Sequence, residues 1–110
     1  LHVDPRTQAT ELMIRSPGNF YVPPHWHSAN ETHTVLRGTF TVEGDGSKET
    51  LNAGGFNYIP AKMVHRGWIG PEGMLVFITV EGAWDINWVN GPPSSENQPV
   101  LQKRGGTLFP

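Results

Sequence analysis

The chain has 110 residues, the size of one domain, and it contains no cysteine, which excludes disulfide bridges, thiolate metal sites and cysteine nucleophiles. A formal net charge of −2 provides no electrostatic footprint for nucleic acid or for an anionic membrane surface. Thirteen glycines and ten prolines make the chain rich in turns without reaching the fraction typical of disorder.

Short runs of alternating apolar and polar residues follow one another along the chain, and glycine or proline separates them. Such runs predict strands over residues 11–16, 20–22, 25–28, 31–37, 39–43, 48–51, 56–59, 64–69, 74–80 and 84–89. A hairpin turn is expected at 44–47. Many short strands with turn chemistry between them favour an all-β sandwich or barrel. We expect a single domain over 1–110, with its core at about 11–89 and a tail at 90–110 that wraps the barrel or frays.

Histidines in the middle of the chain carry the chemistry. His25 and His27 are two residues apart and therefore point to one side of a strand, and so do Glu31 and His33 on the next strand. His65 lies on a later strand and can add another ligand. Imidazole and carboxylate together suit iron, manganese, copper, nickel or zinc. A single histidine is more often a surface or satisfied core residue, but this combination is hard to obtain by chance.

These residues resemble the two sequence motifs of the cupin superfamily. His25, His27 and Glu31, with Gly38 after six further residues, resemble the first motif, although its opening glycine is one residue early at Gly18. Gly54, Pro60 and His65 resemble the second motif. The resemblance covers roughly residues 11–89 and implies a jelly-roll β-barrel of two antiparallel sheets. It also implies that His25, His27, Glu31 and His65 are the metal ligands.

Two positions depart from the second motif. Lys62 stands where glycine is usual, which puts the geometry of the turn in doubt, and Ile69 stands where asparagine is usual. Gly67 shares the face of His65 and Ile69, so it either leaves open space near the metal or marks a bulge.

His33 is unusual beside this ligand set, and three interpretations stay open. It could replace Glu31 as a ligand, act as a donor that orients Glu31 or a bound oxygen species, or be an ordinary core histidine. An imidazole-rich site shifts the expected metal towards copper or iron. We expect one transition-metal ion per subunit, with copper favoured and iron or manganese next.

The aromatic residues suggest how a substrate or a partner is held. Trp26 and Trp68 are expected to point away from the metal and to stand side by side on the outer face of one sheet. That pair would form a homodimer seam, a platform for sugar rings, or plain packing under the tail. Tyr21 is expected near the barrel mouth, and Tyr58 is the candidate phenol near the metal. Trp84 and Trp88 are expected in the core or the seam.

Several functions fit this site. The first is a metal-dependent oxidoreductase, because the ligands leave open positions for oxygen chemistry. Size, site and aromatic content resemble the copper-dependent cupins that oxidatively cleave cellulose with O2 or peroxide. The alternatives are a small-molecule dioxygenase, a lyase or isomerase with Tyr58 or His33 as base, and a non-catalytic sugar or metabolite binder. The partner would be a carbohydrate or a small molecule, not nucleic acid or membrane. Because the sequence begins at Leu1, we expect a removed leader and export, with a cytoplasmic location as the alternative.

Overall fold

The computed structural model describes residues 1–98 and confirms the all-β class. Its strands alternate between inward apolar and outward polar side chains, as the sequence pattern requires. They are β1 (His2–Val3), β2 (Thr10–Ser16), β3 (Tyr21–Trp26), β4 (Glu31–Gly44), β5 (Ser47–Leu51), β6 (Phe56–Ile59), β7 (His65–Val80) and β8 (Asn87–Trp88), followed by the short 3₁₀ helix η1 (Ser95–Asn97).

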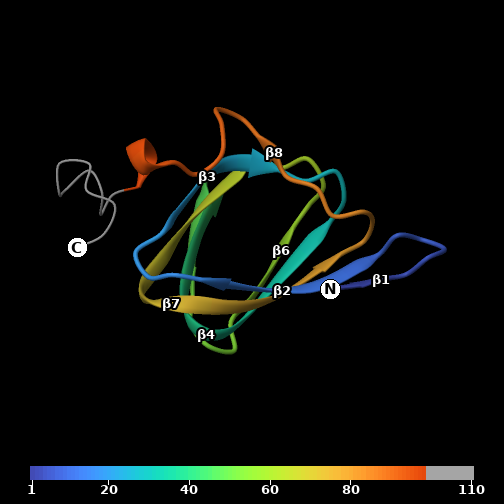
Figure 1. Ribbon diagram of the computed structural model, residues 1–110, viewed down its shortest axis with the longest axis horizontal. Coiled ribbons are helices and arrows are strands. Elements are labelled where there is room, and N and C mark those ends of the chain that lie inside the picture. The colour runs from blue at the N-terminus through green and yellow to red at the C-terminus, as the bar shows by residue number, and fades with distance from the viewer. Residues whose placement is uncertain (99–110) are drawn as a thin grey trace.

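The strands form two antiparallel layers that share β4 and β7 (Figure 1). The C-terminal half of β7 lies between β2 and the first half of β4, and β6 pairs with the outer side of β4. The N-terminal half of β7 lies between β3 and the second half of β4, with β8 and β5 at the edges. This arrangement is the jelly-roll barrel expected from the sequence.

Both long strands bend where they pass from one layer to the other. The sequence predicted two strands for each of them, separated at Gly38 and at 70–73, but the ladder continues through both sites with shifts in register. Gly38 and Gly73 have φ values of 80° and 81°, a conformation that glycine adopts without steric cost. A Cβ at position 38 would lie 1.9 Å from the carbonyl oxygen of Gly73, so the two bends need bare backbone.

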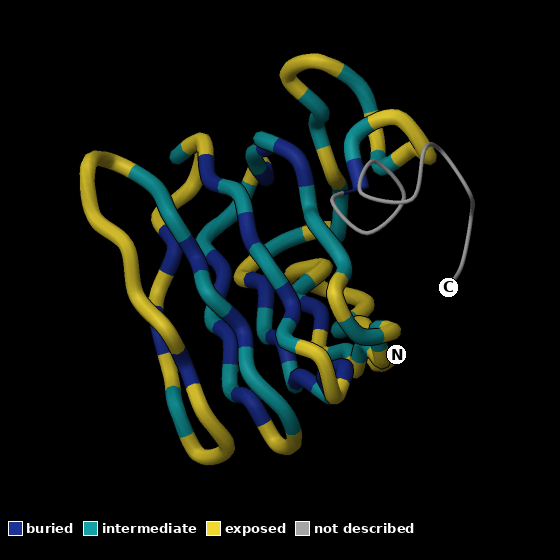
Figure 2. The backbone as a smooth tube through the Cα atoms, turned by 90° about the vertical axis from the view of Figure 1, so that its left-hand side faces the viewer, coloured by how far each residue is buried: buried dark blue, intermediate teal, exposed yellow. Residues whose placement is uncertain are grey.

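The core lies between the two layers, where buried residues alternate along the strands while the hairpin tips are exposed (Figure 2). The layer that contains β2 packs against the layer that contains β3 through buried aliphatic side chains. They include Val35, Val76, Ile78 and Val80, each 3% exposed or less. This packing fills one part of the interior, and histidines fill the other.

The turns and the C-terminal segment agree with the sequence in part. The hairpin at 44–47 is confirmed, with Gly44 opposite Ser47. The strand expected over 84–89 is reduced to two paired residues in β8. Gln98 hydrogen-bonds both backbone groups of Tyr21, at 2.7 and 2.8 Å, and residues 99–110 of the expected tail lie outside the described residues. Within 1–98, no helix has the length and apolar character needed to cross a membrane.

Candidate metal centre

Three imidazoles meet at one end of the barrel interior. His25 in β3 lies opposite His65, the first residue of β7, and His27 follows two residues after His25 on the same side. One ring nitrogen from each lies within 4.8 Å of the others. The three residues are 7%, 3% and 2% exposed in sequence order, so the cluster is inside the protein. The predicted convergence of these residues is confirmed.

The backbone fixes the tautomer of each ring. Nδ1 of His25 lies 2.8 Å from the carbonyl oxygen of Pro23, Nδ1 of His27 2.5 Å from that of Asp85, and Nδ1 of His65 3.0 Å from that of Met63. A carbonyl oxygen only accepts, so each neutral ring carries its proton on Nδ1 and has a bare lone pair on Nε2. This is the arrangement by which proteins orient histidine ligands of a metal.

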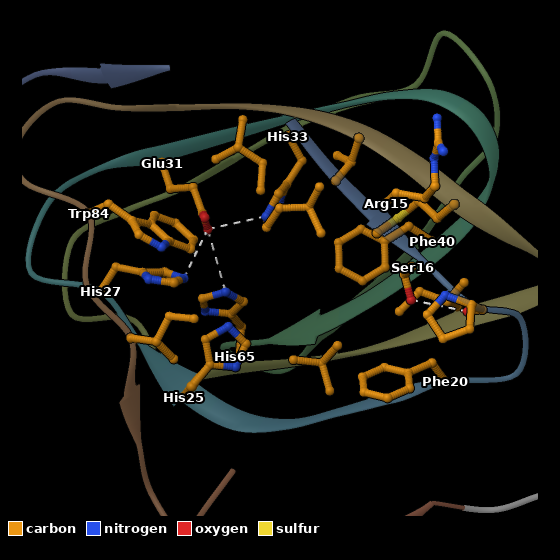
Figure 3. Close-up of a pocket in the computed structure, with 18 of the residues that line it drawn as sticks. Arg15, Ser16, Phe20, His25, His27, Glu31, His33, Phe40, His65 and Trp84 are labelled. Carbon is orange, nitrogen blue, oxygen red and sulfur yellow. Dashed lines mark hydrogen bonds and ion pairs between the residues drawn. The ribbon is translucent and has the colours of Figure 1, made fainter. Parts of the chain in front are cut away.

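A carboxylate closes the cluster from the neighbouring strand. Oε1 of Glu31, a residue that is 1% exposed, lies 3.3 Å from Nε2 of His27, 3.6 Å from Nε2 of His65 and 3.2 Å from Nε2 of His33 (Figure 3). Among the described residues, neither this oxygen nor His65 Nε2 has an aligned hydrogen-bond partner. Lone pairs that face one another in a buried site need a cation between them, so these residues fit a transition-metal ion.

The electrostatics of the site keep the ligand atoms available. Burial lowers the pKa of His65 to about 4, and burial also lowers the pKa of His25. Burial acts against ionised Glu31, but the imidazoles of His27 and His33 hold its pKa well below the usual range. Burial also opposes protonation of His27, yet its contact with the Glu31 carboxylate raises the pKa of that imidazole. The carboxylate is therefore ionised at neutral pH, and two of the imidazoles are firmly neutral.

A cavity of about 250 Å³ extends from the cluster into the barrel. Apart from the histidines and Glu31, most of the side chains that line it are apolar: Ile14, Phe20, Val22, Phe40, Ile69, Met74, Val76 and Ile78. Arg15 and Phe20 lie at the end away from the cluster (Figure 3). The site thus joins a polar, metal-binding end to an apolar body.

Two tryptophans form the wall beside the metal centre, although the sequence placed them in the core or a seam. Trp84 stacks on His27 with ring centroids 5.0 Å apart, and Trp88 lies 5.1 Å from the ring of His25. Both line the cavity together with Ile86. Their period-2 spacing indicated a shared face, but only the chain path after β7 shows that this face covers the histidines.

Asp85, between these aromatics, ties this segment to the ligand strand. Its carboxylate accepts hydrogen bonds from the backbone N–H of Ser28, at 2.9 Å, and from the Ser28 hydroxyl. The hydrogen bond from the Ser28 hydroxyl lowers the pKa of Asp85, so the Asp85 carboxylate is ionised when it accepts these hydrogen bonds. The same residue holds His27 through its carbonyl oxygen, and the segment therefore positions a ligand as well as covering it.

Two tyrosines expected near the substrate or the barrel mouth lie elsewhere, and two tryptophans expected to be neighbours are apart. Tyr58 is on the outward side of β6 and is 49% exposed, so its phenol does not lie near the metal centre as expected. Tyr21 packs on Trp68 outside the cavity, with ring centroids 5.5 Å apart. Trp26 does not stand beside Trp68: the register places Tyr21 opposite Trp68 and His25 opposite His65, so the two tryptophans lie towards opposite ends of the pairing. Whether either forms a homodimer seam or a sugar platform stays a prediction.

The departures from the expected motif have structural explanations. Lys62 takes the positive φ of the usual glycine, 67°, and its N–H still bonds the carbonyl of His27 at 2.8 Å. Gly67 leaves no open space, because a Cβ there would lie 2.4 Å from the ring of Phe40. Nor is it a bulge, since it pairs in register with Val22 and with β4. Ile69 lines the cavity, as predicted.

Comparison with known proteins places this architecture in a family. The model of the Cupin domain family matches residues 11–81. No curated protein matches. A solved RmlC-like cupin from Shewanella frigidimarina is 25% identical, with a TM-score of 0.62 over 70% of this chain and 68% of that one.

Two solved enzymes share the fold at lower identity. The DMSP lyase DddQ from Ruegeria pomeroyi is 18% identical with a TM-score of 0.68, over 74% of this chain and 43% of that one. An oxalate oxidase is 20% identical with a TM-score of 0.67, over 90% of this chain and 57% of that one. The present chain is thus shorter than either enzyme, and the likeness to them concerns the fold. With the family model spanning most of the barrel, the chain belongs to the cupin domain family.

Proposed function

We propose that this cupin is a mononuclear metal-dependent oxidoreductase that acts on a small molecule with an oxygen donor at one end and an apolar body. One observation carries the proposal: the Nε2 lone pairs of His25, His27 and His65 converge at one end of an apolar cavity. Binding sites for small molecules are typically apolar cavities in which a few polar groups orient the ligand.

The residues divide the work between the two ends of the cavity. His25, His27 and His65 would hold the ion, and Glu31 would complete or flank its ligand set. When bound, a transition-metal ion supplies Lewis-acid and redox chemistry at that point. Phe40, together with the other apolar side chains, would exclude water and hold the body of the substrate. Copper is the favoured ion and iron or manganese the next, because the donors are mainly imidazole.

Cavity size favours a small substrate over the polysaccharide suggested by the sequence. A polymer would have to bring a glycosidic bond to ligands that are at most 7% exposed, through a space of about 250 Å³. A molecule of a few heavy atoms faces no such barrier. The lyase and the oxalate oxidase that share the fold are named for small molecules, which supports this size class.

The cavity lining favours oxidoreductase chemistry over a lyase. Among the described lining residues, only Glu31 and His33 are titratable groups next to the three imidazoles, and they already contact each other at 3.2 Å. A lyase or isomerase would need one of them to leave that contact and act as the base. We keep this as the alternative, with His33 as the base, because Tyr58 lies outside the cavity.

Metal loading followed by substrate consumption tests the proposal. The metal-free protein is reconstituted with copper, iron, manganese or nickel, and bound metal is counted by mass spectrometry. Oxygen uptake and product formation are then followed with oxalate, a β-diketone, DMSP and a cello-oligosaccharide. We expect one ion per chain, and turnover of a small substrate but not of the oligosaccharide.

Two variants sharpen the result. His65→Ala should lose stoichiometric metal, because it removes one of the three converging lone pairs. Ile14→Phe, which fills the apolar end, should keep the metal and lose turnover. The proposal fails if the wild-type chain binds no ion, if His65→Ala binds it with unchanged affinity, or if only the oligosaccharide is oxidised.

A further inference from the structure

We infer that His33 is not a metal ligand but the residue that positions Glu31 towards the three-imidazole cluster, with Asn57 selecting the ring tautomer that this role needs. The inference rests on the proposed metal centre and concerns how that centre is built. Sequence alone left His33 with three interpretations, and the hydrogen-bond partners of the four imidazoles separate them.

His33 differs from the other three histidines in what holds its Nδ1. Backbone carbonyls fix Nδ1–H in His25, His27 and His65, so their Nε2 atoms are bare. The partner of His33 Nδ1 is Oδ1 of the Asn57 side chain, 2.8 Å away on β6. Unlike a backbone carbonyl, an amide also carries an NH2 group that it can turn towards the ring nitrogen, so among these four histidines only His33 can carry its proton on Nε2.

The surroundings favour that proton. Nε2 of His33 lies 3.2 Å from Oε1 of Glu31, and a bare lone pair there would oppose an ionised carboxylate. As placed, Nδ2 of Asn57 has no hydrogen-bond partner among the described residues. Turning the amide exchanges Oδ1 and Nδ2, so that the NH2 group faces His33 Nδ1 and the oxygen is left without a partner. A buried carbonyl oxygen without a partner costs less free energy than a buried N–H group without one. The neutral ring then donates Nε2–H to Glu31.

Packing holds His33 at the carboxylate. Its side chain is 5% exposed, and the edge of Phe40 packs against the ring at 5.3 Å between centroids. Glu31 and His33 are two residues apart on β4, so their side chains point to the same inward side. The ligand nitrogens that lie within 4.8 Å of one another are those of His25, His27 and His65, and neither His33 nor Glu31 belongs to that set. When His33 donates to one side of the Glu31 carboxylate, the remaining lone pairs of that carboxylate point towards the three-imidazole cluster.

Copper loaded into the protein as a spectroscopic probe tests the inference without an activity assay. Pulsed electron paramagnetic resonance counts the coordinated imidazoles, and chelator competition measures affinity. We expect three imidazoles in the wild-type chain and three in His33→Gln, which keeps an N–H donor near Glu31. His27→Gln is the matched control and should show two.

Affinity separates positioning from simple packing. His33→Leu should keep three imidazoles but bind copper about 10–100-fold more weakly, the usual cost of losing a group that orients a ligand. His33→Gln should restore most of that affinity. In a Glu31→Gln background, His33→Leu should have little further effect, because its action runs through the carboxylate. Asn57→Leu should weaken binding in the same direction as His33→Leu.

Each opposite result overturns the inference. A wild-type spectrum with four imidazoles, or the loss of one in His33→Gln, would make His33 a ligand. Unchanged affinity in His33→Leu, or an equal loss with and without Glu31, would remove the positioning role. Absence of copper binding by the wild-type chain would instead refute the metal centre itself, so the two failures are distinguishable.

Discussion

The stability of the metal-free protein should fall between pH 7 and pH 5 because its ligand histidines are buried. His65 is the main contributor. Burial lowers its pKa from 6.5 to about 4. Below pH 6.5 His65 becomes protonated in the unfolded chain but stays neutral in the folded chain, so protonation stabilises the unfolded state. The contribution of neutral His65 to the free energy of unfolding is therefore present above pH 6.5 and is lost as the pH falls to about 4.

The size of this loss follows from the shift. One pKa unit corresponds to about 1.4 kcal/mol, so the whole shift is worth about 3 kcal/mol, and about 2 kcal/mol of it is lost by pH 5. His25 acts in the same direction, because burial lowers its pKa as well. His27 acts in the opposite direction, since the Glu31 carboxylate raises its pKa. Glu31 itself changes little above pH 5, because its pKa is lowered.

A variant isolates the His65 contribution from the others. Urea unfolding is measured by tryptophan fluorescence in the presence of a chelator, at pH 7 and pH 5, for the wild type and for His65→Asn. We expect the wild type to lose about 2 kcal/mol more than the variant between the two pH values. An equal loss in both proteins, or a wild type that is more stable at pH 5, would refute the reasoning.

Three further substitutions test the turn, the strand and the wall around the metal. Lys62→Gly should raise the free energy of unfolding by about 1 kcal/mol, because it removes a side chain from a positive-φ position; lower stability in urea would count against this. Gly67→Ala should cost about 1–3 kcal/mol, since the new Cβ forces the ring of Phe40 aside, and unchanged stability would show that the ring yields freely. Trp84→Leu should weaken metal binding by up to about tenfold through loss of the stack on His27; unchanged affinity in chelator competition would make the wall passive.

Local pattern predicted much of the fold because strand and turn signals act over a few residues. The alternation along 74–80 and the turn at 44–47 appear as predicted. Merging of the strands across Gly38 could not be predicted, because glycine usually interrupts a strand. Here two glycine bends on the paired strands β4 and β7 lie against each other, and this close approach lets the ladder between them continue.

The placement of the tryptophans shows the same limit. Period-2 spacing correctly put Trp84 and Trp88 on one face, but it could not say what that face covers. Trp26 and Trp68 seemed adjacent because their strands are neighbours, yet the antiparallel register separates them. Register is a property of two strands together, and no single strand encodes it.

The sequence alone determined the fold class and the set of atoms that can bind a metal, because alternation and motif spacing are local. Tertiary structure decided how those atoms are used. The carbonyls that hold His25 and His65 lie two residues earlier in the chain, in β3 and just before β7, so these two contacts are local. The carbonyl that holds His27 comes from Asp85, in the segment after β7, and the amide of Asn57 reaches His33 from a strand 24 residues away. Proton positions depend on such partners, and for His27 and His33 folding alone brings the partner into contact.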